Sequence, residues 1–257
     1  MQKDPKLLLE ACVDSVESAL AAEQGGAHRL ELCDSLADGG TTPSAGMIAA
    51  VSSSVRIPVF VIVRPRGGGF VYSAAELDVM RRDVELALRF GAHGIVIGAL
   101  DGDRRVATGE TRSLIAAAQG APVTFHRAFD LVSDQCAALD ALADMGVQRV
   151  LTSGGAATAR EGAEQIARLV AHAAGRLVVM AGGGIREENV ADVVCISSVR
   201  EIHVRGTRLH GAGDAGYPIA LRKPLPADEG AWEETDAGRV AAMLRLGEAA
   251  IAARVSR

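Results

Sequence analysis

The feature that most constrains this chain is a regular alternation of short, branched aliphatic runs with longer stretches rich in alanine and leucine. Eight such runs begin about 22 to 35 residues apart, which is the spacing of βα units. The predicted strands are Leu7–Val13, Arg29–Cys33, Val59–Pro65, Gly94–Leu100, Val123–Phe129, Arg149–Gly154, Arg176–Ala181 and Glu201–Arg205. Eight consecutive units predict a parallel sheet that closes into a barrel. We therefore expect an α/β protein with a single-domain (β/α)8 TIM-barrel fold over residues 1–257, with a doubly wound open sheet as the alternative.

Several expected helices begin at a residue that can cap a helix N-terminus. Ser73 stands three residues before a glutamate, which is the pattern of a capping box. Ser133 is expected to head a helix over Asp134–Met145. A stretch rich in Gly and Pro lies between the eighth strand and a last helix expected over about 235–254. We predict that this stretch, about 207–234, is a long loop at the carboxyl end of the barrel.

Composition excludes several classes of partner. The chain has 257 residues, a net charge of −5 and 3% aromatic residues, so it lacks the basic runs and aromatic platforms that bind nucleic acids. Its longest apolar runs have the length of a strand, and its first residues show no apolar signal segment. Four cysteines are too few for a disulfide scaffold. We expect a cytoplasmic protein with free thiols that binds neither nucleic acids nor membranes.

Polar side chains gather on one face of the predicted strands. Because side chains alternate along a strand, the aliphatic set should face the helices and the other set the barrel interior. The polar residues of that inner set are Glu10, Cys12, Arg29, Glu31, Cys33, Arg64, His126, Glu201, His203 and Arg205. Such groups are costly to bury without partners, and barrel interiors usually hold branched aliphatic residues. They therefore indicate a functional site at the carboxyl ends of the strands.

Two cysteines on consecutive strands are candidate metal ligands. Cys12 and Cys33 each follow a glutamate by two residues, and neighbouring strands lie about 4.8 Å apart. Two thiols on the same face could therefore hold one soft ion, Cu(I) or Zn(II). The alternative is that both are small, inert, buried thiols, which is common for cysteine.

Arginines and glycine-rich turns at the strand ends are candidate anion ligands. Guanidinium groups bind carboxylate or phosphate through paired hydrogen bonds, and glycine turns after the later strands of a barrel often expose amides to phosphate. The candidate anion-binding residues are Arg64, Arg66, Arg127, Gly154, Gly183, Gly184 and His203. Two alternatives stay open: Arg64 pairs with Glu10 or Glu31 inside the barrel, and the glycines serve only tight turns.

An imidazole beside carboxyl groups could transfer protons. His126 at the end of the fifth strand, with Glu10 and Glu31, forms a candidate catalytic set. In this interpretation the chain is a lyase, isomerase or hydrolase acting on a small phosphorylated or carboxylated metabolite. The alternative is that His126 has a structural role only.

Several long motifs, in order, resemble those of the CutC copper homeostasis family over roughly residues 7–205. They are Glu10-Ala-Cys-Val-Asp-Ser-Val-Glu-Ser-Ala, Gly25-Gly-Ala-His-Arg-Leu-Glu-Leu-Cys33, Gly39-Gly-Thr-Thr-Pro-Ser44, Ile57-Pro-Val-Phe-Val-Ile-Val-Arg-Pro-Arg-Gly-Gly68, Val123-Thr-Phe-His-Arg-Ala-Phe-Asp130, Arg149-Val-Leu-Thr-Ser-Gly-Gly155 and Met180-Ala-Gly-Gly-Gly-Ile185. The resemblance implies a TIM barrel, a cytoplasmic homodimer or homotetramer, and a role in copper handling. It also implies that Cys12 and Cys33 are Cu(I) ligands. The chain departs from the family's usual pattern where Arg205 follows His203 by two residues.

Three hypotheses about function follow. The first is copper homeostasis, with copper bound at the mouth of the barrel by the two cysteines and no organic cofactor. The second is the barrel enzyme described above, whose partner would be a small anion. The third is an oligomeric scaffold without catalysis. The fold by itself does not choose among them.

Overall fold

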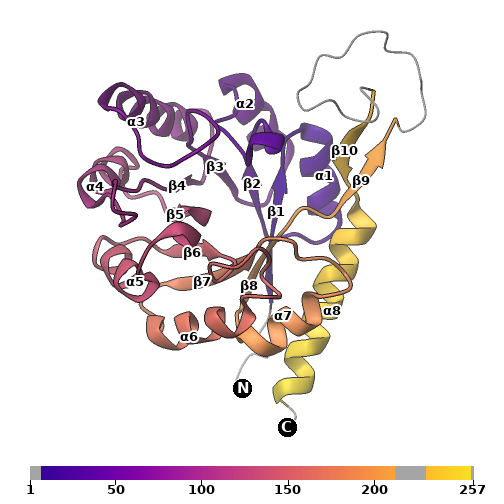
Figure 1. The fold of residues 1–257 in the computed structure, drawn as a ribbon. Helices are drawn as coiled ribbons and strands as arrows, with labels where there is room; N and C mark the ends of the chain where they lie inside the picture. The colour runs from indigo at the N-terminus through magenta and orange to yellow at the C-terminus, as the bar shows by residue number, and fades with distance from the viewer. Residues whose placement is uncertain (1–6, 212–229, 256–257) are drawn as a thin grey trace.

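The computed structural model describes residues 7–211 and 230–255, and it places eight parallel strands in a closed barrel (Figure 1). The strands pair in sequence order from β1 to β8, and β8 returns to β1. The TIM-barrel prediction is therefore confirmed, and the open sheet is wrong. The barrel strands are β1 (Leu8–Val13), β2 (Arg29–Leu32), β3 (Val59–Ile62), β4 (Gly94–Ile97), β5 (Val123–Phe125), β6 (Arg149–Thr152), β7 (Val178–Gly182) and β8 (Glu201–Val204).

Helices surround the barrel, one after each strand in the usual order of the fold (Figure 1). They are α1 (Val16–Gln24), α2 (Ala45–Ser54), α3 (Ala74–Arg89), α4 (Thr108–Ala117), α5 (Gln135–Asp144), α6 (Ala163–Ala173), α7 (Val190–Ser197) and α8 (Ala237–Val255). Two short 3-10 helices, Leu36–Asp38 and Arg127–Leu131, follow β2 and β5. No helix in the described ranges is long and apolar enough to cross a bilayer.

The capping predictions are confirmed for one helix and corrected for another. Ser73 and Glu76 form the expected capping box at the start of α3, each bonding the other's backbone N–H. At α5 the capping residue is Asp134 and not Ser133, because the Asp134 carboxylate accepts hydrogen bonds from the backbone N–H groups of Cys136 and Ala137.

The alternation of side chains divides the barrel into two apolar regions. Leu7, Leu9 and Ala11 belong to the large core between the sheet and the helices. Cys12 and Cys33 belong to a small separate cluster inside the barrel, together with Phe60, Ile62 and Val96. The predicted inner and outer faces of the first three strands are therefore confirmed.

The prediction of a long loop over about 207–234 is wrong at both ends of that range. Strands β9 (Thr207–His210) and β10 (Trp232–Thr235) form a separate antiparallel pair, in which Thr207 lies opposite Thr235. The Thr235 amide donates a hydrogen bond to Ser18 Oγ of α1 at 3.1 Å, so this β9–β10 pair, called the hairpin below, is anchored beside α1. The rest of the predicted loop, residues 212–229, lies outside the described residues.

Candidate functional site

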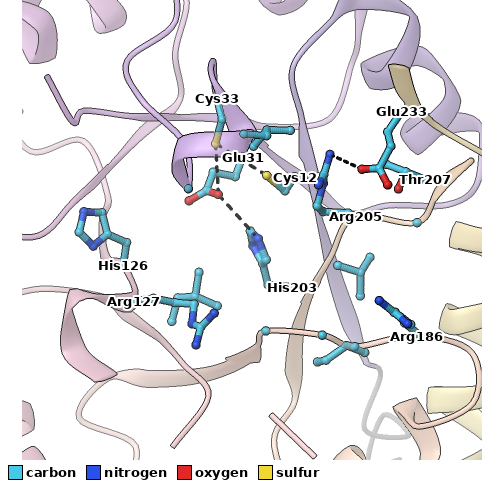
Figure 2. A pocket seen from close by; sticks show the side chains of 18 of the residues that line it. Cys12, Glu31, Cys33, His126, Arg127, Arg186, His203, Arg205, Thr207 and Glu233 are labelled. Carbon is cyan, nitrogen blue, oxygen red and sulfur yellow. Dashed lines mark hydrogen bonds and ion pairs between the residues drawn. The ribbon is translucent and has the colours of Figure 1, made fainter. Parts of the chain in front are cut away.

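A cavity of about 550 Å³ opens at the carboxyl ends of the barrel strands. Residues from the ends of β1, β2, β3, β5, β7 and β8 contribute to its wall (Figure 2). The hairpin also contributes, through Thr207 and Glu233. The site therefore lies where barrel proteins carry their functional groups.

The two predicted metal-ligand cysteines meet at one side of this cavity. Cys12 of β1 lies opposite Glu31 of β2 in the parallel register, and Cys33 follows two residues later on the same face. Their sulfur atoms lie 3.7 Å apart, and the two residues are 6% and 2% exposed. Two sulfurs at this spacing can both contact one ion at an ordinary metal–sulfur distance of about 2.3 Å. The juxtaposition that the metal-site prediction requires is therefore present.

Glu31 completes the group on the cysteine side. Its Oε2 accepts a hydrogen bond from Cys33 Sγ at 3.4 Å and lies 3.7 Å from His203 Nε2. Its Oε1 is buried and has no hydrogen-bond partner among the described residues. Burial raises the pKa of this carboxyl group to about 8, so it is largely protonated at neutral pH. One ligand atom each from Cys12, Glu31 and Cys33 lie within 4.8 Å of one another.

His203 of β8 lies beside this group and is held by a second carboxylate. Its Nδ1 lies 2.8 Å from Glu10 Oε1, which directs Nε2 toward Glu31 and Cys12. Burial alone would lower the pKa of His203, but Glu31, Cys12 and Glu10 together raise it well above its ordinary value. His203 is therefore a cation between acidic groups.

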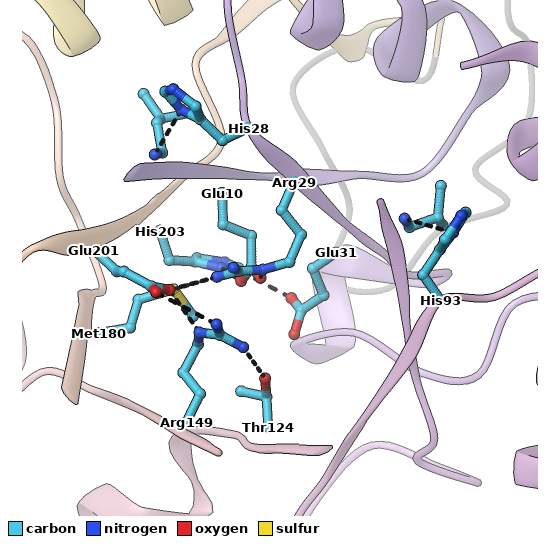
Figure 3. A network of polar contacts seen from close by, with 12 residues as sticks. Glu10, His28, Arg29, Glu31, His93, Thr124, Arg149, Met180, Glu201 and His203 are labelled. Atoms are coloured by element: carbon cyan, nitrogen blue, oxygen red, sulfur yellow. Dashed lines mark hydrogen bonds and ion pairs between the residues drawn. The ribbon is translucent and has the colours of Figure 1, made fainter. Parts of the chain in front are cut away.

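An ionic layer deeper in the barrel supports His203 (Figure 3). The Arg29 guanidinium pairs with Glu10 and, at 2.7 Å, with Glu201, and Arg149 also pairs with Glu201 at 2.5 Å. Burial would raise the pKa of Glu10, but Arg29 and His203 outweigh burial and lower it to about 2. Glu10 is thus a fixed anion with a positioning role, and it is absent from the cavity wall. We did not predict from the sequence that Arg149 faces inward. Side chains alternate along β6, so an outward-facing Val150 would have indicated an inward-facing Arg149.

The two thiols are electrostatically unequal. The hydrogen bond between them, aided by His203, lowers the pKa of Cys12 well below its ordinary value. The same hydrogen bond and burial raise the pKa of Cys33 well above its ordinary value. One thiolate, at Cys12, is therefore stabilised in the metal-free site, while Cys33 keeps its proton.

The structure gives Arg64 loop contacts in place of the ion pair considered from the sequence, and its role as an anion ligand stays a prediction. Its guanidinium donates to the carbonyl oxygens of Asp38, Gly40 and Gly68, each at 2.8 Å. It forms neither of the ion pairs considered with Glu10 or Glu31, since Arg29 and not Arg64 is the arginine partner of Glu10. Arg64 lines the cavity, but its primary contacts fix the loops after β2 and β3.

His126, the predicted proton-transfer residue, is also in the cavity wall. Its Nδ1 accepts a hydrogen bond from the Ala128 amide at 3.1 Å. Burial and the nearby Arg64 cation lower its pKa to about 3, so the ring is neutral at physiological pH. An imidazole with this pKa is a poor general acid, and Glu31 and His203 are placed better for proton transfer.

The remaining predicted anion ligands divide into two groups. Arg127, Gly183 and Gly184 line the cavity with His203. Arg66 lies outside it, paired with Glu76 at 2.5 Å and packed on Tyr72, and Gly154 is not in the wall. Sequence reasoning missed Arg186, which follows the glycine turn after β7 and lines the cavity. Its position three residues after Gly183 was the available signal.

Fold and site together define a TIM-barrel protein with a buried pair of thiols and a neutral carboxyl group at the carboxyl ends of its strands. The chain matches the model of the CutC family over residues 7–208, and it belongs to that family.

Relatives of known name support this assignment. The chain is 48% identical to the human copper homeostasis protein cutC homolog over 91% of this chain and 86% of that protein. It is 46% identical to a CutC family protein of Xylella fastidiosa, over 93% and 88% of the two chains. A crystal structure of CutC from Streptococcus agalactiae superposes with a TM-score of 0.74 at 35% identity, covering 77% of this chain and 98% of that one.

Proposed function

We propose that this protein binds Cu(I) through Cys12 and Cys33 and serves copper homeostasis. The observation that carries the proposal is the 3.7 Å separation of two buried sulfur atoms at the end of neighbouring strands. Related proteins are named for copper homeostasis, which agrees with this chemistry. A cytoplasmic location and a homodimer or homotetramer remain predictions that go with this function.

The donor set suits a soft monovalent ion. Thiolates favour Cu(I), whereas carboxylate and imidazole donors alone favour harder ions. Glu31 Oε1 has no partner in the metal-free site, so Glu31 can supply a third donor once its carboxyl group has lost its proton. Zn(II) could also use two sulfurs with an oxygen or nitrogen donor, so it is the competing metal in any test.

Charge balance explains how two thiolates could be held in a buried place. Cys12 already favours the thiolate, and the His203 cation beside it compensates that charge. Cys33 holds its proton, so metal binding at the pair must release that proton. The proposal therefore predicts that copper affinity increases with pH.

Anaerobic titration of the reduced protein with Cu(I), against a competing chelator, tests the proposal. We expect about one Cu(I) per chain, with affinity lowered at least about a hundredfold in Cys12→Ser and in Cys33→Ser. Cys136→Ser is the matched control, because Cys136 lies on α5 outside the cavity wall. Binding that is unchanged by the first two substitutions, or tighter binding of Zn(II), would contradict the proposal.

One observation keeps the enzyme as a second candidate function. The cavity of about 550 Å³ is within the size range of small-molecule sites, and Glu31 and His203 line it. A neutral carboxyl group next to an imidazolium is an arrangement that can exchange protons with a ligand. Reaction with any metabolite that is abolished by Glu31→Gln, in metal-free protein, would support an enzyme.

A further inference from the structure

The cavity is much larger than a metal ion requires. Cys12, Glu31 and Cys33 form one part of its wall, while other residues from β5, β7 and the hairpin form the rest. A volume of about 550 Å³ matches the clefts that hold small organic molecules. The groups on the wall away from the cysteines should therefore indicate what such a molecule is.

One arginine side chain of this wall has neither a hydrogen bond nor an ion-pair partner among the described residues. Glu187 pairs with Arg239 at 2.8 Å, and Glu233 pairs with Arg205 at 2.9 Å. The Arg186 guanidinium has no hydrogen bond or ion pair among the described residues, and Figure 2 shows it beside the cavity. Arg186 and Glu188 are both exposed, and both line the cavity.

Two backbone donors without partners precede Arg186 in the chain, at Gly183 and Gly184. In the turn after β7, the carbonyls of Gly183 and Gly184 accept hydrogen bonds from the Ala159 amide and from Asn189 Nδ2, both at 2.8 Å. The N–H groups of Gly183 and Gly184 have no partner among residues 7–211 and 230–255. Both glycines have positive φ angles, which expose their amides in one turn.

A second arginine packs on the same turn. The guanidinium of Arg127 lies so close to Gly183 that an added Cβ there would be 3.1 Å from Arg127 Cζ. Its Nε and Nη2 bond Asp130 and Ser153, each at 2.8 Å, which fixes the plane of the group over the glycine. The remaining edge of Arg127 is free to bind an acceptor.

A buried donor of the wall also lacks an acceptor. His126 is 5% exposed, and its Nδ1 accepts from the Ala128 amide. In the neutral ring the proton therefore lies on Nε2. This Nε2 atom is buried without a hydrogen-bond partner. An N–H group of this kind is costly unless an acceptor is supplied, here by a ligand.

We propose that the cavity binds a phosphate-bearing small molecule, with its phosphate at the Gly183–Gly184 turn beside the Arg127 guanidinium, while Arg186 on the same wall adds positive charge. The unsatisfied groups on this wall are donors from several directions, and a phosphate offers three acceptor oxygens where a carboxylate offers two. The rest of the molecule would then extend toward Glu31 and His203. The inference goes beyond copper binding and does not depend on it.

Isothermal titration of the metal-free, reduced protein tests the proposal, with inorganic phosphate at constant ionic strength in chloride. We expect saturable binding that Arg186→Ala and Arg127→Met each weaken about tenfold. Arg168→Ala is the matched control, an exposed arginine on α6 outside the cavity wall, and it should leave binding unchanged. Glycerol phosphate should bind at least as tightly as phosphate, and glycerol should not bind.

Several outcomes overturn the proposal. They are no saturable binding of phosphate or glycerol phosphate, equal weakening by Arg168→Ala, or acetate binding as tightly as phosphate. Cys12→Ser should bind phosphate like the unsubstituted protein, and Arg186→Ala should bind Cu(I) like it. The phosphate site and the copper site can therefore fail independently of each other.

Discussion

Replacing Arg29 with methionine tests whether the ionic layer inside the barrel holds the site together. The Arg29 side chain is 10% exposed, pairs with Glu10 and Glu201, and lies 5.2 Å from the centre of the Phe60 ring. Breaking a buried pair by removing one partner costs about 3–5 kcal/mol. Each carboxylate keeps one partner, because His203 lies 2.8 Å from Glu10 and Arg149 lies 2.5 Å from Glu201. We therefore expect a loss of about 3 kcal/mol for Arg29→Met.

Equilibrium unfolding in urea, followed by circular dichroism, measures this loss. For a chain of this size it corresponds to a fall in melting temperature of about 6–12 °C. Arg168→Met is the control, since Arg168 is 70% exposed and lies 3.9 Å from its partner Glu164, and it should change stability by less than about 0.5 kcal/mol.

The stability lost in Arg29→Met should depend on pH, because it comes from the ionised Glu10 carboxylate. The pKa of Glu10 in the folded protein is lowered to about 2, so its contribution is present above its ordinary pKa and lost as pH falls through 2. The difference between the unsubstituted protein and Arg29→Met should therefore shrink below about pH 4.5. Glu10→Gln should lower the free energy of unfolding less in the Arg29→Met variant than in the unsubstituted protein. A loss below about 1 kcal/mol, or additive effects of the two changes, would refute the reasoning.

Three further predictions concern the cavity wall. The pKa of Glu31 in the folded protein is raised to about 8, so Glu31→Gln should stabilise the metal-free protein increasingly from pH 5 to 8. In urea unfolding the gain in free energy of unfolding should grow by up to about 1.4 kcal/mol per pH unit. A stability difference between the two proteins that stays constant with pH would contradict the assigned protonation. The pKa of His126 in the folded protein is lowered to about 3, so the unsubstituted protein should lose stability relative to His126→Asn as pH falls from 6 to 4. The same urea assay should show a similar change in free energy of unfolding per pH unit. Stability curves of the two proteins that run parallel over this pH range would contradict the prediction. An added Cβ at Gly98 would overlap the His126 ring, so Gly98→Ala should cost about 1–3 kcal/mol in thermal unfolding; an unchanged melting temperature would show that the ring moves freely.

The barrel and the inner polar face could be predicted because both follow from periodicity. Regular spacing of aliphatic runs gives the eight strands, and alternation within each strand separates Leu9 and Ala11 from Glu10 and Cys12. The register could not be predicted. It places Cys12 opposite Glu31 and so brings the thiols to 3.7 Å, and it depends on backbone pairing that the sequence does not display.

Loop-dependent features could not be predicted from the residues alone. The partners of Arg64 are three loop carbonyls, whose positions depend on turns that no side-chain pattern specifies. The β9–β10 pair was missed because its strands are four residues long, carry charged residues and are far apart in sequence. Arg149 could have been assigned by the same alternation that placed Arg29.

X-ray absorption at the copper edge, on reduced protein loaded with one Cu(I) per chain, tests the central claim most directly. The account predicts two sulfur neighbours of the copper ion, one of which is lost in Cys12→Ser and one in Cys33→Ser. Cys136→Ser should leave the spectrum unchanged. A copper ion surrounded by oxygen and nitrogen alone, or two sulfur neighbours that persist in both single variants, would contradict it.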